Sequence, residues 1–255
     1  MSTLRTAAIA AAAVASLAAI APAPLHAQYE AGREVKFTVR IENVSTPATL
    51  KLSDGQTAPA PTAPLLWTIT DVGNPLFTPG KLDAGRGLER LAEDGNPGVL
   101  SDYITQNVKS ITYSGVVTKP VGESNDGPIL PGKAYEFTVS AAPGQRLSMA
   151  FMFGQSNDLF YAPGAEGIAL FDAKGKPLTA DVTRQLSLWD AGTEVNEEPG
   201  LGASQAPRQP APNTGKAEHK PIRLASSVKD GFRYPATADV IKVTIRAAAA
   251  TTAAR

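Results

Sequence analysis

The sequence predicts a mostly β protein, an antiparallel β-sandwich with a short helical insertion. Several short segments alternate apolar and polar side chains, which is the period of a strand with one buried face. Strand and helix patterns do not alternate along the chain as they do in parallel sheets with crossover helices. The 22 glycines and 21 prolines supply the turns that many short strands require.

Eight strand segments account for the predicted sheets. The segment 34–44 has the clearest alternation, with Phe37, Val39 and Ile41 on one face. The segment 146–153 is almost continuously apolar, which is typical of a central strand buried on both faces. In chain order the strands are expected at residues 34–44, 65–70, 110–117, 134–141, 146–153, 167–171, 185–189 and 239–246.

Two short helices form the predicted insertion. Residues 87–94 place Leu88 and Leu91 on one face and stop before Gly95. Residues 97–107 open with a proline, which is favoured in the first turn of a helix. Helices this brief are expected to pack on the sandwich rather than to form a domain of their own.

The two ends of the chain are expected to lie outside the fold. Residues 1–27 have the pattern of a signal peptide, with one charge, Arg5, before the apolar run 7–20 and small residues at the cleavage site. That run is too short and too alanine-rich for a membrane span, so the mature chain has no predicted transmembrane segment. Residues 28–246 are predicted to form a single domain that is secreted or periplasmic, and residues 247–255 a disordered tail.

Charge and cysteine content narrow the classes of function. There are 24 basic and 24 acidic residues, a balance that gives no electrostatic reason to expect nucleic acid or an anionic membrane as a partner. An exported chain usually has access to disulfides, yet this one has no cysteine. The fold must therefore depend on core packing or on a bound metal.

The sequence shows few of the residue patterns that are typical of enzymes. The chain lacks cysteine and the G-x-S-x-G nucleophile pattern, and removal of the signal peptide leaves His219 as its single histidine. A zinc site is also disfavoured, because zinc is usually bound by cysteine and histidine side chains. A pair drawn from Asp158, Asp190 and Glu194 would suit glycoside hydrolysis, but aromatic residues, which usually form the platforms for sugars, make up 6% of the chain.

The segment 186–200 concentrates acidic and turn-forming residues after an apolar strand. Asp190 and Glu194 lie four residues apart across a turn, and Asp158 follows the central strand. Calcium binds six to eight oxygens, and because the EF-hand pattern is absent, a calcium site here would be assembled from distant segments. The alternative interpretation is that the acids cap turns or are solvated.

Two of these segments resemble a known family. SNDLFYAPG at 156–164 and LSLWDAGTEVNEEPG at 186–200 are similar to the spondin amino-terminal domain, as are the segments 75–95 and 127–139. The resemblance covers about residues 35–246. It implies an extracellular β-sandwich with one bound calcium.

The resemblance also implies the ligands of that ion, which fall on Asp158, Asp190 and Glu194. The third position departs from the animal members of the family, which have aspartate there, and the extra methylene of glutamate changes the reach of the carboxylate. Animal members also carry cysteines and repeat modules that this chain lacks. Their matrix adhesion is therefore not transferred.

The sequence thus predicts a secreted calcium-binding module that serves binding, adhesion or an envelope-associated role and is not an enzyme. Its partner is expected to be an unidentified protein or glycan at the cell envelope, the chain is expected to be a monomer, and the polar loop 200–221 is a candidate binding surface. One alternative is a carboxylate- or metal-dependent hydrolase acting on envelope polysaccharide. Another is a metal-free surface module.

Overall fold

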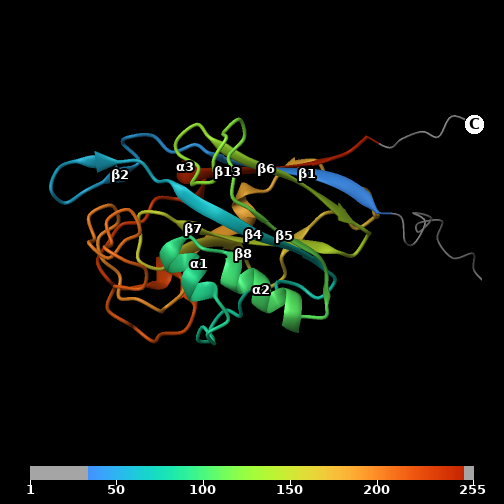
Figure 1. Cartoon of the computed structure of the whole chain (residues 1–255). Coiled ribbons are helices and arrows are strands. Elements are labelled where there is room, and N and C mark those ends of the chain that lie inside the picture. The colour runs from blue at the N-terminus through green and yellow to red at the C-terminus, as the bar shows by residue number, and fades with distance from the viewer. Residues whose placement is uncertain (1–33, 250–255) are drawn as a thin grey trace, which may run out of the picture.

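The computed structural model describes residues 34–249. Two antiparallel sheets pack face to face, and two helices cover the outer face of the larger sheet (Figure 1). The predicted fold class, an antiparallel β-sandwich with a short helical insertion, is confirmed. The expected signal peptide, 1–27, lies outside the described residues, as does most of the expected tail. No helix in the described range is long and apolar enough to cross a membrane.

The smaller sheet holds the segment with the clearest alternation at its centre. Phe37, Val39 and Ile41 of β1 are buried, while the intervening side chains are at least partly exposed. Strand β1 pairs on both sides, which fixes its register. In sheet order the strands are β10 (Ala180–Asp181), β13 (Ile241–Ala247), β1 (Val35–Asn43) and β6 (Ala134–Ala141).

The larger sheet holds the apolar strand β7. Its residues 147–153 are all buried, because one face packs against the smaller sheet and the other lies under a helix. In sheet order the strands are β12 (Arg223–Leu224), β11 (Leu186–Asp190), β8 (Leu159–Pro163), β7 (Arg146–Phe153), β4 (Thr62–Thr70) and β5 (Ile111–Val117). Strand β9 (Ile168–Ala169) also pairs with β7, and β2 (Leu50–Lys51) and β3 (Thr57–Ala58) form a separate hairpin.

Helices α1 (Leu88–Asp94) and α2 (Gly98–Asn107) form the predicted insertion. Leu91 and Leu100 belong to a second apolar core between the helices and the outer face of the larger sheet. Gly95 ends α1 in the left-handed conformation, as the sequence predicts. The remaining short helices are η1 (Thr183–Gln185), η2 (Ala225–Ser227) and α3 (Thr237–Val240).

The structure differs from the sequence prediction around residue 158. Residues 154–158 form a turn, and the chain returns as β8, a strand that was not predicted from the sequence. Strand β8 is buried at every position and pairs with β7 and β11. The strand expected at 167–171 shortens to the two residues of β9.

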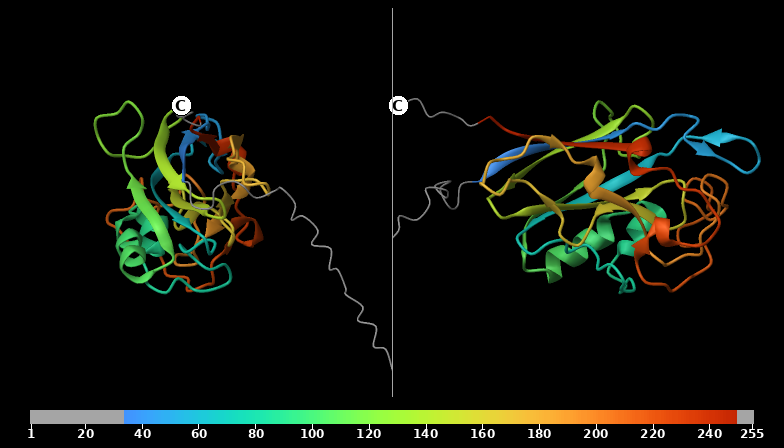
Figure 2. Two further views of the ribbon diagram at one scale, coloured as in Figure 1. Left: turned by 90° about the vertical axis from the view of Figure 1, so that its right-hand side faces the viewer. Right: turned by 180° about the vertical axis from the view of Figure 1, so that it is seen from behind.

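The loops that follow β11 gather at one end of the sandwich. The orange segments, which correspond to residues 191–235, lie beside the β2–β3 hairpin in both Figure 1 and the rear view of Figure 2. The start of β1 and the end of β13 lie at the opposite end, where Phe37 pairs with Ala247. We refer to the end formed by residues 154–158 and 190–221 as the loop end.

Candidate metal centre

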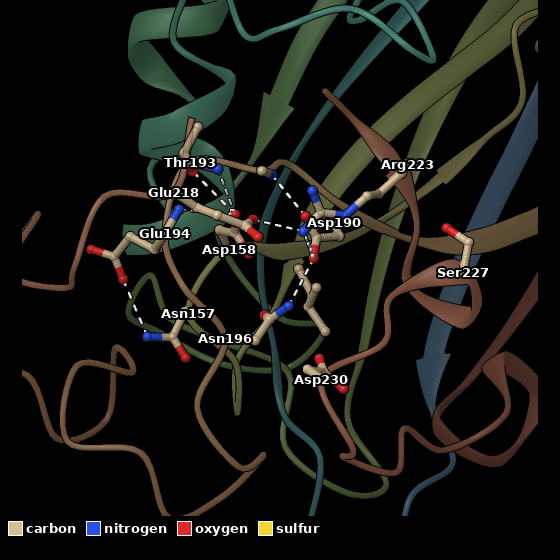
Figure 3. Close-up of polar contacts among 12 residues, drawn as sticks. Asn157, Asp158, Asp190, Thr193, Glu194, Asn196, Glu218, Arg223, Ser227 and Asp230 are labelled. Carbon is tan, nitrogen blue, oxygen red and sulfur yellow. Dashed lines mark hydrogen bonds and ion pairs between the residues drawn. The ribbon is translucent and has the colours of Figure 1, made fainter. Parts of the chain in front are cut away.

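Strand pairing brings Asp158 and Asp190 to the same edge of the sheet. Leu159, the first residue of β8, lies opposite Asp190, the last residue of β11. The backbone N–H of Ala191 donates to the carbonyl oxygen of Asp158 at 3.1 Å. The two aspartates are 32 residues apart in the chain, yet their side chains project into the same turn region (Figure 3).

The two carboxylate oxygens of Asp158 have different surroundings. Oδ2 accepts hydrogen bonds from the backbone N–H groups of Thr193 at 2.8 Å and Glu194 at 3.1 Å, and from the Thr193 hydroxyl at 3.3 Å. Oδ1 is buried and has no hydrogen-bond partner. Burial of the fully inaccessible side chain, together with the charge of Asp190, raises the pKa of Asp158 to about 7.

Asp190 is also buried, but its oxygens are better satisfied. Oδ1 accepts from the backbone N–H of Gly192 at 2.8 Å, and Oδ2 accepts from the Asn196 amide at 2.8 Å and from Arg223 at 3.2 Å. The same Arg223 nitrogen contacts Glu218 at 2.6 Å, so one cation serves two carboxylates. Burial raises the pKa of Asp190, opposed by Asn196 and Arg223.

Glu194 is directed away from the two aspartates (Figure 3). Its Oε1 accepts from the backbone N–H of Gly215 at 2.7 Å, and its Oε2 accepts from the Asn157 amide at 3.3 Å. Burial raises the pKa of Glu194 as well. The longer side chain therefore joins the turn to the following loop, where an ideal Cβ on Gly215 would lie 2.0 Å from the Glu194 carboxylate.

The loop 200–221 folds back over the acidic turn. The carbonyl oxygens of Gly192 and Thr193 accept hydrogen bonds from the N–H groups of Lys220 and Glu218, both at 2.8 Å. Gly192 has a φ of 71°, and an ideal Cβ there would lie 2.2 Å from the Lys220 carbonyl oxygen. The segment that the sequence marked as a candidate binding surface thus forms one wall of the site.

The cavity nearest to the acidic turn has a volume of about 150 Å³ and, like the larger cavities, is not lined by Asp158 or Asp190. Its lining includes Thr193, Glu194, Glu89 and His219. Typical small-molecule pockets measure about 300–1,000 Å³. Cavities of about 560 and 620 Å³ lie elsewhere and are not lined by Asp158 or Asp190.

The donor set fits a hard cation in part. The available donors are carboxylate, amide and carbonyl oxygens, which calcium prefers, and Asp158 supplies a buried oxygen that no hydrogen bond satisfies. Within residues 34–249, however, no three side chains of the His, Asp and Glu types converge closely enough to hold a metal ion. The structure brings Asp158 and Asp190 together, and the roles of Asp158, Asp190 and Glu194 as metal ligands all stay predictions.

One acid near this site was not predicted from the sequence. Glu93 on α1 has an exposed fraction of 2%, and its Oε2 has no hydrogen-bond partner. Burial, with smaller contributions from the charges of Glu194, Glu89 and Asp158, raises the pKa of Glu93 to about 8, partly offset by the adjacent Thr193 hydroxyl. Glu93 lies one helical turn after the partly exposed Glu89, so the periodicity of the sequence predicts solvent exposure instead.

Similarity to known proteins adds no identification. No known protein family and no curated protein matches the chain. The resemblance of residues 156–164 and 186–200 to the spondin domain therefore stays a prediction. What the structure establishes is an antiparallel sandwich with a buried acidic turn at its loop end.

Proposed function

We propose that this protein is a calcium-binding β-sandwich module in which the ion links the turns of the loop end. The observation that carries the proposal is the Oδ1 atom of Asp158, a buried carboxylate oxygen without a partner, beside the second buried carboxylate of Asp190. Turn capping explains the hydrogen bonds of Asp158 Oδ2 and Asp190 Oδ1. It does not explain Asp158 Oδ1.

Electrostatics favours a divalent cation at this position. A buried ion without compensation costs several kcal/mol after relaxation of the protein. Arg223 approaches Asp190 at 3.2 Å, also pairs with Glu218 and lies within the influence of the Asp158 charge, so one cation is shared among three carboxylates. A calcium ion would supply two positive charges and accept oxygen ligands.

Asp158 and Asp190 are the residues that would hold the ion, with backbone carbonyls and water filling the remaining positions. Glu194 would join them by exchanging its contacts with Gly215 and Asn157. Because two carboxylates form the core of the site, we expect a dissociation constant of about 10⁻⁴ to 10⁻³ M, the range of extracellular modules.

The bound ion would stabilise a surface for a partner at the cell envelope, a protein or a glycan, and the chain would act after export. Among the cavities described above, none is lined by Asp158 or Asp190, so none could hold a polysaccharide chain against them. The enclosure of these two carboxylates favours the binding module over the hydrolase alternative.

The proposal predicts that Asp158→Asn abolishes calcium binding. The amide removes the charge and leaves the shape of the side chain nearly unchanged. The measurement is calorimetric titration of chelator-treated protein with calcium, with magnesium as a second titrant. Wild type is expected to bind calcium saturably and in preference to magnesium.

Asp172→Asn is the matched control. Asp172 also caps a turn, accepting from the backbone N–H groups of Lys174 and Lys176 at 2.8 and 2.9 Å, but it lies in an exposed hairpin. This variant should bind calcium as wild type does. Absence of saturable binding in wild type, or equal losses in the two variants, would contradict the proposal.

A further inference from the structure

We propose that Glu93 of helix α1 is a calcium ligand, so that the ion connects the helical insertion to the loop end of the sandwich. The inference rests on the proposed function and extends it to an element that neither the acidic motif nor the spondin resemblance assigns to the site. It also adds a carboxylate to those of Asp158 and Asp190, one that would reach the ion by rotation of its side chain.

The first observation is the environment of the Glu93 side chain. Its neighbours on α1, Leu91 and Ala92, are buried in the second apolar core, and α1 packs on β7 and β8. A glutamate on a protein surface normally extends its carboxylate into water, but only 2% of Glu93 is exposed. Its Oε2 is enclosed without a hydrogen bond, which is costly for a carboxylate unless a cation or a proton compensates it.

The second observation is the position of Glu93 relative to Asp158. Thr193 lies between the two acids: its N–H and hydroxyl donate to Asp158 Oδ2, and its hydroxyl also lies beside the Glu93 carboxyl. The helix drawn in teal passes behind Thr193 in Figure 3. Glu93 and Asp158 therefore both adjoin Thr193, and each has one buried oxygen without a hydrogen-bond partner.

The adjacent acid on the helix has charged and polar partners that Glu93 lacks. Asp94, the next residue, is paired with Arg90 at 2.5 Å and accepts from the Gln209 amide at 2.9 Å. The charged groups that act most strongly on Glu93 are all acidic: Glu194, Glu89 and Asp158. A divalent cation matches this surplus of negative charge.

Glu93 also has an advantage over Glu194 as the third carboxylate. Glu194 would have to leave the Gly215 N–H and the Asn157 amide to reach the ion. The Oε2 atom of Glu93 has no hydrogen bond to break. Rotation of the Glu93 side chain toward Asp158 therefore costs less than rotation of the Glu194 side chain.

The test compares Glu93→Gln with Glu89→Gln. Both variants remove one negative charge from α1, but Glu89 is partly exposed and lies on the preceding turn. Terbium, which replaces calcium at oxygen sites, serves as the probe; Trp189, next to Asp190, sensitises its luminescence. Lifetimes in normal and heavy water then report how many water molecules the bound ion retains.

Glu93→Gln is expected to weaken calcium and terbium binding by about tenfold or more, a loss on the scale reported for altered metal-site partners. The bound terbium should also gain a water molecule where the carboxylate was removed. Glu89→Gln should leave both readings as in wild type. Circular dichroism and thermal unfolding of the calcium-free variants check the fold, and the neutral amide at position 93 is expected to fold at least as stably as wild type.

The outcomes separate this inference from the function on which it rests. No calcium or terbium binding by wild type overturns both. Calcium binding that is lost in Asp158→Asn but unchanged in Glu93→Gln overturns the role of Glu93 alone. Two other outcomes also overturn the assignment of Glu93 as a ligand. One is weaker calcium binding by Glu93→Gln with no added water on the bound terbium, and the other is an equal loss of affinity in Glu89→Gln. Either outcome shows that the charge of the side chain, and not its direct contact with the ion, affects binding.

Discussion

At the scale of single residues, protonation and calcium compete for the same buried oxygens. Folding raises the pKa of Asp158 from 3.8 to about 7 and that of Glu93 from 4.5 to about 8. A carboxyl group with a raised pKa holds its proton more tightly in the folded protein than in the unfolded chain. Its contribution to stability is therefore complete below pH 4 or so and is lost as the pH rises through about 7 to 8.

Calcium-free protein should consequently be less stable at pH 8 than at pH 5. Each pKa unit corresponds to about 1.4 kcal/mol, so the two groups together give a decrease of several kcal/mol in the free energy of unfolding. Urea denaturation in chelator across this pH range measures the decrease. Asp158→Asn should flatten the profile, and saturating calcium should oppose the loss; an unchanged slope in the variant would contradict the role of Asp158.

The sequence predicted those candidate ligands that directly follow a recognisable strand or turn. The turn after β11 and the acid after β7 marked Asp190 and Asp158, and the structure brings these two together. The direction of Glu194 was not predictable, because it depends on Gly215, a residue of a distant loop. Glu93 was missed because helical periodicity does not show that a loop covers that side of α1.

At the scale of elements, a glycine in β5 makes room for a tryptophan side chain of the neighbouring strand β4. Gly115 of β5 lies under the indole of Trp67 of β4, and an ideal Cβ there would be 2.8 Å from a ring carbon. Trp67 in turn stacks on Phe137, with ring centroids 5.6 Å apart. The absence of a side chain at Gly115 thus leaves the space that the tryptophan occupies.

Gly115→Ala is therefore expected to destabilise the fold by about 1–3 kcal/mol, the usual cost of overpacking. Gly164→Ala is the control, since its added Cβ would meet no atom within 4 Å. Chemical denaturation of both variants measures the difference. Equal stabilities of the two variants would show that the indole moves aside without cost.

Element boundaries were predictable where a strand has one buried face and not where both faces are buried. Strand β1 alternates, and its prediction from the sequence extends one residue beyond the observed strand at each end. Strand β8 is five residues long and buried throughout, so it has no alternation to detect. Its place between β7 and β11 is nevertheless what brings Asp158 opposite the end of β11.

At the scale of the whole molecule, two apolar cores share one sheet. The first core fills the space between the sheets, and the second lies between the larger sheet and helices α1 and α2. The chain has no disulfide, so a bound ion would be its cross-link between distant segments. Because calcium would bind the folded protein and not the unfolded chain, it should raise the unfolding temperature.

Calcium at about 100 times its dissociation constant should stabilise the protein by about 2.7 kcal/mol. For a chain of this size that corresponds to an increase of about 5–10 °C in the unfolding temperature. Thermal unfolding in chelator, followed by titration with calcium and separately with magnesium, provides the measurement. A flat profile in protein shown by elemental analysis to be metal-free would contradict calcium binding.

The pairing of Phe37 with Ala247 has a consequence for how the molecule can be attached to a surface. Both boundaries of the sandwich lie side by side, at the end opposite the acidic loops (Figure 2). A tether joined before β1 or after β13 therefore leaves the loop end facing outward in either case. The fold is suited to display: fusion to a carrier or immobilisation on a sensor through either boundary presents the same face to solution.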